Sequence, residues 1–301
     1  MIELRHVAAT QLELAFGGDT FNTAAYLARV GGTDIRVDYA TALGDDPYSE
    51  AMRENFRQEG VGTDLVAMLP GRLPGLYAIR VDATGERSFF YWRREAAARS
   101  MLEGAAGDRL ATALGDRDWI YFSGITLSIL SDDSRERLFA ILSAARRTGT
   151  KVAFDTNFRA RGWPDLDTAR AVMNRAVTHA DLALPTFPDE HALFGDADPD
   201  VTIARMAALG VPEIVVKNGR APIRIRTPAG TRQVECPAVA QVVDTTAAGD
   251  AFNAGYLAAR MHAAMPERAA AAGCHLAGIV IGHRGAVIPR AATPALEKFW
   301  C

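Results

Sequence analysis

The chain has 301 residues, of which 49% are hydrophobic and 23% charged, and its formal net charge is −3. This length and composition are typical of one large globular domain, and the small charge argues against nucleic acid or an anionic membrane surface as a partner. No apolar run is long enough to span a bilayer, and the first residues lack the pattern of a secretory signal, so we expect a cytoplasmic protein.

The first segment with a functional pattern is residues 16–22, Phe-Gly-Gly-Asp-Thr-Phe-Asn, which precedes an apolar helix predicted over residues 23–30. Its two glycines allow a ligand to approach the backbone closely, while Asp19 and Asn22 carry short polar groups suited to sugar hydroxyls. Composition alone favours a turn followed by a helix N-cap over a sugar site.

Residues 76–82 and 87–93 predict two strands joined by a tight turn at residues 83–86. An apolar face on this hairpin needs a covering partner, which is either a sugar site or the main sheet. Tyr77 and Tyr91 offer hydroxyls. A sugar acid also needs a cation, and arginine is the side chain best shaped to hold a carboxylate at two points, so Arg93 and Arg159 are candidates.

From residue 119 onward, short apolar runs alternate with helical stretches. This alternation predicts an α/β fold with a doubly wound, mostly parallel sheet and helices on both faces. Ligands of such sheets bind beyond the carboxyl ends of the strands, where residues 155–159 and 217–219 fall. The expected strands are residues 119–123, 151–155, 181–184 and 213–217, and the expected helices are residues 133–147, 168–179 and 201–209.

The most informative segment is residues 244–250, Asp-Thr-Thr-Ala-Ala-Gly-Asp, which runs into a helix rich in small residues. Bare backbone N–H groups at a helix start bind anions, and small side chains leave room for a phosphate. A carboxylate beside a phosphate is explained if Asp250 accepts a proton from the attacking hydroxyl. The alternative is a plain N-cap, but the doubled threonine and the run of small residues favour the catalytic interpretation.

Segment 244–250 resembles the C-terminal motif of the ribokinase-like (phosphofructokinase B type) carbohydrate kinases, and the resemblance extends from Phe16 to Pro289. Ala247, where most members have glycine, makes it most similar to the 2-keto-3-deoxygluconate kinases. The resemblance implies a single ribokinase-like domain over residues 1–301, with a small β lid formed by about 1–14 and 74–95. It also implies that Asp250 is the catalytic base and that the amides of Ala247, Ala248 and Gly249 help form an anion hole.

The same resemblance assigns the binding residues. It implies that the sugar acid contacts Gly18, Asp19, Asn22, Tyr77, Tyr91, Arg93, Arg159 and Asp250. It implies that ATP contacts Asn157, Arg159, Lys217, Gly219, Ala247, Ala248 and Gly249. Thr186 and Asp189 stand where the family has the Asn and Glu of a motif that organises Mg²⁺ through water. An oxygen ligand therefore remains at Asp189, and Glu190 is the alternative.

The resemblance thus implies ATP-dependent phosphorylation of 2-keto-3-deoxygluconate to 2-keto-3-deoxy-6-phosphogluconate. Two alternatives stay open: a kinase for a neutral sugar such as fructose or ribose, and a non-catalytic relative that binds sugar or nucleotide. An exposed lid hairpin also makes a homo-oligomer through the lid an expectation.

Members of this family generally open with an apolar strand that precedes the segment resembling residues 1–14. We expect either a natural start upstream of Met1, which we favour, or loss of that strand. The three cysteines, Cys236, Cys274 and Cys301, are an odd number without close spacing, and this predicts neither a disulfide framework nor a zinc site.

Overall fold

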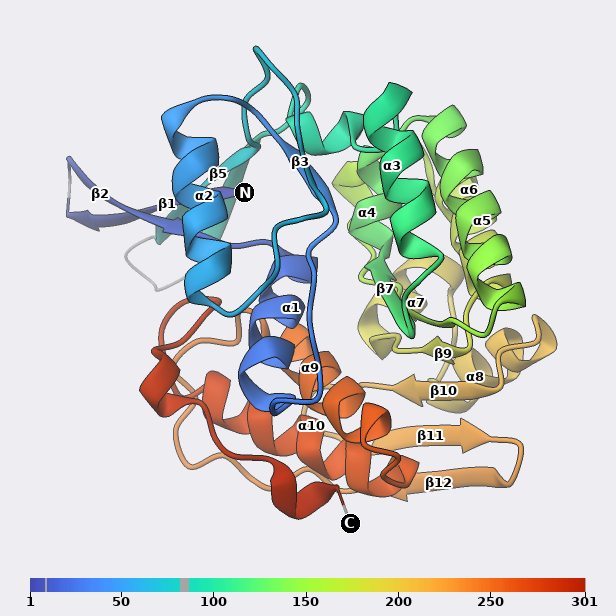
Figure 1. The fold of residues 1–301 in the computed structure, drawn as a ribbon. Helices are drawn as coiled ribbons and strands as arrows, with labels where there is room; N and C mark the ends of the chain where they lie inside the picture. The colour runs from blue at the N-terminus through green and yellow to red at the C-terminus, as the bar shows by residue number, and fades with distance from the viewer. Residues whose placement is uncertain (9, 82–86, 301) are drawn as a thin grey trace.

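The structure is a computed structural model that describes residues 1–8, 10–81 and 87–300. Its larger sheet contains the strands β7 (Trp119–Ser123), β8 (Lys151–Asp155), β9 (Leu182–Ala183), β10 (Glu213–Val216), β11 (Ile223–Thr227) and β12 (Gly230–Val234), in the order β12-β11-β10-β9-β8-β7 (Figure 1). Strands β7 to β10 run parallel, whereas β11 and β12 are antiparallel additions. The predicted strands therefore lie within a residue or two of the observed ones.

Helices cover both faces of this sheet. Alternate residues of each strand point to opposite sides, so apolar strands contribute side chains to a core on each face. In β10, Ile214 and Val216 join one hydrophobic core, while Val215 joins the other. The doubly wound α/β prediction is confirmed. The first core packs against α3 (Gly104–Leu114), α4 (Gly124–Ile129), α5 (Asp132–Arg147), α6 (Leu166–Thr178), α7 (Phe187–Phe194) and α8 (Pro199–Ala208), and the second against α1 (Asp19–Val30), α9 (Ala248–Met261) and α10 (Pro266–Val280).

Helices α9 and α10 touch closely at two glycines. A Cβ atom at Gly255 would lie 2.9 Å from the Ala272 carbonyl oxygen, and one at Gly273 would lie 2.8 Å from the Phe252 carbonyl oxygen. Only residues without a side chain fit at this crossing. The helix that begins at segment 244–250 is thereby held directly against α10.

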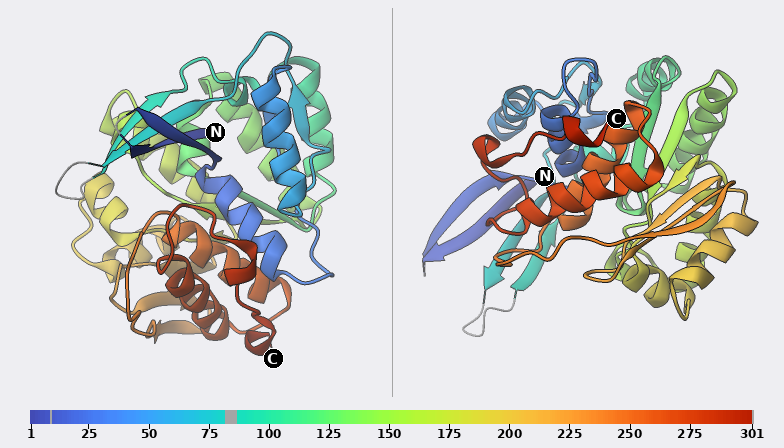
Figure 2. Two further views of the ribbon diagram at one scale, coloured as in Figure 1. Left: turned by 90° about the vertical axis from the view of Figure 1, so that its left-hand side faces the viewer. Right: turned by 90° about the horizontal axis from the view of Figure 1, so that it is seen from below.

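A second, smaller sheet has the order β2-β1-β5-β6, with β1 (Ile2–Ala8), β2 (Gln11–Phe16), β5 (Leu76–Val81) and β6 (Arg87–Trp92), and Figure 2 shows it projecting from the body. The predicted hairpin corresponds to β5 and β6, although its turn at 83–86 lies outside the described residues. The strand register places Glu3, Tyr77 and Tyr91 on one face. The opposite face carries exposed apolar side chains, namely Leu12, Leu14, Phe90 and Trp92.

A parallel pair of short strands, β3 (Thr41–Leu43) and β4 (Val66–Met68), lies beside α2 (Pro47–Gln58). Within the described part of the chain, β7 is the last strand of the larger sheet, and a cleft lined by Leu43 and Phe122 separates it from β3. None of the helices described is both long and apolar enough to cross a membrane. Short 3₁₀ helices complete the fold at Ala97–Ser100, Ala160–Gly162, Arg290–Ala292 and Glu297–Phe299.

Candidate active site

One cleft of about 1620 Å³ collects the catalytic and binding residues that the sequence predicted, except for Glu190, the alternative metal residue. It opens at the carboxyl ends of β7, β8 and β10, as expected for a doubly wound sheet. The N-termini of α1 and α9 and the polar face of the smaller sheet complete its walls. The lining includes Gly18, Asp19, Asn22, Tyr77, Tyr91, Arg93, Asn157, Arg159, Asp189, Lys217, Gly219, Ala247, Ala248, Gly249 and Asp250.

The start of α9 has the geometry of an anion-binding turn. Ala247 precedes the helix with a φ of 60°, a left-handed conformation that favours glycine. The Asp244 carboxylate accepts hydrogen bonds from the amides of Thr246 (2.8 Å) and Gly285 (2.9 Å), which fixes the turn. The amides of Gly249 and Asp250 fall in the first helical turn, where backbone N–H groups have no acceptor within the helix.

Asp250 stands at this turn as a buried carboxylate, with 8% of its surface exposed. Asn22 donates a hydrogen bond of 2.8 Å to its Oδ2 atom. Burial, reinforced by the charges of Asp19 and Asp155, raises the pKa of Asp250 to about 7, although Asn22 and Lys217 act in the opposite direction. A carboxylate with a pKa near neutrality is well matched to accept a proton at physiological pH.

In a pH–rate profile, we expect kcat/KM to rise with pH in a limb whose midpoint lies near pH 7. Only the ionised Asp250 accepts a proton, and burial holds its pKa at about 7. Replacing Asp19 by Asn removes a neighbouring charge that raises this pKa, so the limb should move to lower pH. Initial rates measured from about pH 5.5 to 9 test this expectation, with the exposed Asp64→Asn as control. A limb that stays in place in Asp19→Asn contradicts the electrostatic assignment.

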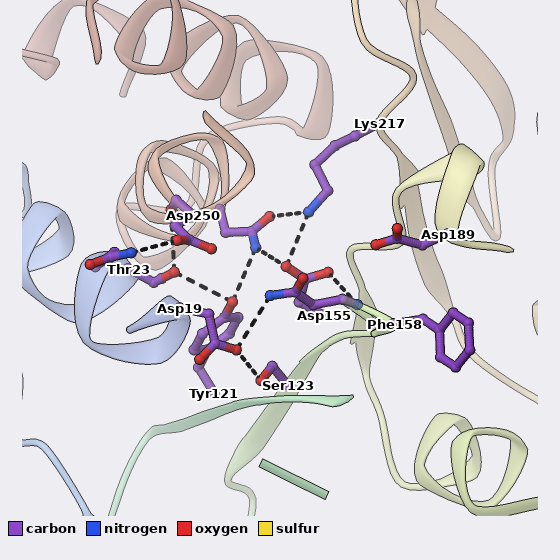
Figure 3. A network of polar contacts seen from close by, with 12 residues as sticks. Asp19, Thr23, Tyr121, Ser123, Asp155, Phe158, Asp189, Lys217 and Asp250 are labelled. Carbon is purple, nitrogen blue, oxygen red and sulfur yellow. Dashed lines mark hydrogen bonds and ion pairs between the residues drawn. The ribbon is translucent and has the colours of Figure 1, made fainter. Parts of the chain in front are cut away.

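A buried polar network lies beneath the start of α9 (Figure 3). The Lys217 ammonium donates to Asn253 Oδ1 (2.9 Å) and to Asp155 Oδ2 (3.3 Å), and Asn253 Nδ2 donates to Asp155 Oδ2 (2.7 Å). Asn253 Nδ2 also contacts the Tyr121 hydroxyl at 3.1 Å. A Cβ atom at Gly249 would lie 3.8 Å from Lys217 Nζ, so the ammonium group is next to the amides of the turn.

Asn253 and Tyr121 were not anticipated as site residues from the sequence. Asn253 lies three residues after Asp250 on the same helix, and this spacing puts the two side chains on one helical face. That signal could have identified Asn253. Tyr121 approaches it from β7, a strand far away in sequence, so its contribution requires the folded sheet.

Asp19, at the first turn of α1, organises the opposite side of the cleft. It accepts hydrogen bonds from the Ser123 hydroxyl and from Asn157 Nδ2, the latter at 3.3 Å (Figure 3). Burial raises its pKa. Asn157, which the resemblance assigned to ATP, therefore contacts a residue assigned to the sugar. Asn22 links this side to the helix start, because its Oδ1 accepts from the Gly18 amide at 3.3 Å while its Nδ2 binds Asp250.

The smaller sheet contributes an aromatic and cationic wall. Tyr77 is buried, and its hydroxyl donates to the carboxylate of Glu3, a residue the sequence did not single out. The Tyr91 ring lies 6.0 Å from the Tyr77 ring. The Arg93 guanidinium is 4.6 Å from the centre of the Tyr91 ring. This arrangement places a cation at the sheet edge of the cleft.

Arg159 and Asp189 form an ion pair of 3.0 Å, in which the arginine side chain is half exposed. Burial raises the pKa of Asp189, against the effect of Arg159. The alternative acid, Glu190, is buried against Arg205 at 2.6 Å and is not among the described residues that line the cleft. Asp189 is therefore the better placed of the two for a metal-bound water.

Beyond Gly219 the cleft continues along an apolar wall formed by the loop after β12 and by α10. Cys236 and Cys274 form a disulfide on this wall, which corrects the prediction from sequence spacing. The two cysteines are 38 residues apart in sequence, but the loop lies against α10 and brings their Cα atoms to 5.3 Å, within the range that a disulfide spans.

A buried carboxylate with a near-neutral pKa, a helix start with open amides and a buried lysine are together suited to phosphoryl transfer to a hydroxyl. The model of the pfkB family of carbohydrate kinases matches residues 3–293, and the chain belongs to this family. It is 44% identical over 300 residues to the 2-dehydro-3-deoxygluconokinase of Dickeya dadantii, covering 98% of this chain and 96% of the relative.

Other relatives are named for different sugars. The chain is 32% identical over 258 residues to a fructokinase of Klebsiella pneumoniae, covering 85% of this chain and 80% of that one. The fold also matches the crystal structure of a fructokinase with bound ATP from Xylella fastidiosa, with a TM-score of 0.81, 23% identity and coverage of 99% and 94%. The fold and the family are therefore shared by kinases that differ in substrate.

Proposed function

We propose that this chain transfers the γ-phosphoryl group of ATP to the terminal hydroxyl of 2-keto-3-deoxygluconate, giving 2-keto-3-deoxy-6-phosphogluconate. The 44% identity to a relative named for this substrate supports the assignment. The observation that carries the chemistry is Asp250, a buried carboxylate held by Asn22 beside the open amides of α9.

In the reaction, the sugar hydroxyl oxygen bonds to the γ-phosphorus while the bond from that phosphorus to the bridging oxygen of ADP breaks. Asp250 takes the hydroxyl proton, and Asn22 keeps its carboxylate oriented. The amides of Ala247, Gly249 and Asp250 and the Lys217 ammonium stabilise the negative charge that develops on the transferred group. The Ala248 amide, which the resemblance also assigned to the anion hole, instead donates to the Thr245 carbonyl oxygen at 3.2 Å. Each well-placed donor of this kind contributes roughly 3–4 kcal/mol in other enzymes.

Selection of a sugar acid rests on Arg93. Its guanidinium lies on the cleft wall next to Tyr91, and we assign it to the carboxylate of the substrate. Tyr77 and Tyr91 would cover the carbon chain, and Asp19 would accept hydrogen bonds from its hydroxyls. A neutral sugar offers the arginine no charged partner.

The nucleotide phosphates fit the end of the cleft that holds Lys217, Gly219 and Arg159, and the apolar wall beyond them suits a base. Mg²⁺ is bound with several waters, one or two carboxylates and the substrate phosphates. The described residues include no cluster of three metal-binding side chains but do include Asp189 on the cleft, and this fits a metal held through water. Bound there, Mg²⁺ would neutralise phosphate charge.

A panel of sugars assayed for ADP release tests the proposal. The panel contains 2-keto-3-deoxygluconate, its galactonate epimer, fructose and ribose. We expect kcat/KM to favour the sugar acids over the neutral sugars by about tenfold to a hundredfold, the value of a charged hydrogen bond. Faster turnover of fructose or ribose would replace the assignment with a neutral-sugar kinase, and saturable binding without ADP release would indicate a non-catalytic relative.

We further propose that the smaller sheet acts as a lid and that a second copy of the chain covers its outer face. That face exposes Leu12 and Leu14 on β2 and Phe90 and Trp92 on β6, the two edge strands of an open sheet. Its inner face carries Tyr77 and Tyr91, which line the cleft.

Introducing a charge on the outer face should therefore separate the copies. We expect the protein to be a dimer by light scattering during gel filtration and Leu12→Glu to be a monomer, because an unpaired carboxylate does not tolerate burial in an apolar interface. Met265→Glu, a change at an exposed methionine outside the sheet, is the matched control. A monomeric parent protein, or a dimer that persists in Leu12→Glu, rules this interface out.

A further inference from the structure

The disulfide between Cys236 and Cys274 lies on the wall of the catalytic cleft. Cys236 comes two residues after β12 and is partly exposed, whereas Cys274 is buried in α10. Both line the same cleft as Asp250. Disulfides are rare in the cytoplasm, where we expect this protein, and those that form there are mostly transient or redox-sensing.

The bridge fixes one end of the loop that carries the anion-binding turn. This loop, residues 235–247, has its other anchor at the end of α10, where the Ile281 carbonyl accepts hydrogen bonds from the amides of Val243 (2.8 Å) and Asp244 (3.1 Å). Between the two anchors, Val239 packs near Gly278, since a Cβ atom there would lie 3.3 Å from Val239 Cγ2. The loop thus lies along about two turns of α10.

The part of the loop between the anchors forms the apolar wall of the cleft. Val239 and Val242 line it, as do Ala277 of α10 and Ile281 directly after α10. Among the described residues, the first backbone hydrogen bonds from this loop to α10 are those at Val243 and Asp244, so the stretch from Cys236 to Val242 relies on packing and on the bridge. When the bridge is open, this stretch can adopt more conformations. Ordering it around a ligand then costs more conformational entropy and weakens binding.

We propose that Cys236 and Cys274 are a reversible redox modification site that tunes nucleotide binding, with the closed bridge favouring the bound conformation of the wall. The inference rests on the proposed function for the identity of the ligand. In the oxidising step, the Cys236 thiolate attacks one sulfur of glutathione disulfide and releases a glutathione thiolate. The Cys274 thiolate then attacks the Cys236 sulfur of the mixed disulfide and releases a second glutathione thiolate. Two electrons pass to the glutathione, and the two cysteine protons pass to solvent or to the released thiolates.

The test uses the full-length protein equilibrated with mixtures of reduced glutathione and glutathione disulfide. Alkylation followed by mass spectrometry measures the redox state of each cysteine. Calorimetry with ADP and the KM for ATP measure nucleotide binding in each state. We expect Cys236 and Cys274 to oxidise together, and the KM for ATP and the Kd for ADP to be about fivefold lower in the oxidised form, with kcat nearly unchanged.

Variants separate the bridge from general oxidation. Cys274→Ser should behave like the reduced parent and lose its response to redox state, while Cys301→Ser should keep the full response. Equal ADP affinity in the oxidised and reduced parent would overturn the proposal, as would a pair that stays reduced throughout the glutathione range. Redox-dependent ADP binding without phosphorylation of any sugar would instead overturn only the proposed function.

Discussion

Asp250→Asn is expected to lower kcat by about two to four orders of magnitude, the range that a general base contributes. Asparagine keeps the shape of the side chain and its contact with Asn22 but does not take the proton of the attacking hydroxyl. The helix start and Lys217 remain in place, so binding of the sugar and of ADP should change little. Steady-state kinetics and calorimetry with each ligand measure the two effects separately.

The same variant should be more stable than the parent at alkaline pH. The folded pKa of Asp250 is about 7, above the value of about 3.9 for an unfolded chain. Below pH 4 the carboxyl is protonated in both states and exerts no penalty. As pH rises from about 4 to about 7 the folded parent loses stability, because the unfolded state ionises first. Asparagine does not ionise and avoids this loss. The midpoint of thermal unfolding of Asp250→Asn should therefore exceed that of the parent by more at pH 8 than at pH 5.

An exposed acid provides the control. Asp64→Asn should leave both kcat and the unfolding midpoint near those of the parent. Retention of most of the activity in Asp250→Asn contradicts the role of Asp250 as base. A loss of activity together with a lower midpoint at both pH values would point instead to damage of the fold.

Arg93→Ala is expected to raise the KM for 2-keto-3-deoxygluconate by about tenfold to a hundredfold, the cost of losing charge-assisted hydrogen bonds to a carboxylate. Because the contact is made equally in the ground state and the transition state, kcat should change less than KM. Arg93→Lys keeps the charge without the two-point geometry and should fall between the parent and the alanine variant.

The neighbouring Arg94 offers a matched control, since it is exposed and does not belong to the described lining of the cleft. Arg94→Ala should leave the KM near the parent value. Any activity on a neutral sugar should be insensitive to Arg93→Ala. An unchanged KM for the sugar acid in this variant means that another cation, with Arg159 the first candidate, holds the carboxylate.

Much of the architecture follows from local patterns in the sequence. The strands at 119–123, 151–155 and 213–216 are short apolar runs bounded by helices, and such runs predict a sheet covered on both faces. The residues of segment 244–250 also act together through adjacent backbone, so their arrangement at a helix start could be read directly from the chain.

Contacts between distant segments could not be predicted in this way. Tyr77 meets Glu3 across 74 positions, because β1 pairs with β5, and Asn157 reaches Asp19 across 138 positions. Each pairing depends on which strands become neighbours or on where a helix packs, and no local pattern encodes either. The pairing of Cys236 with Cys274 could not be predicted for the same reason, because nothing near Cys236 in sequence indicates that its loop lies along α10.

The crossing of α9 and α10 determines where movement is allowed during turnover. With Gly255 and Gly273 in close contact, the proposed base and the proposed phosphate-binding amides belong to a closely packed pair of helices. We therefore expect closure around substrates to come from the opposite rim, the projecting sheet with Tyr91. A methyl group added at Gly273, which is not among the described residues lining the cleft, would push against Phe252 of α9, so we expect it to shift the helix that carries Asp250 and to lower activity.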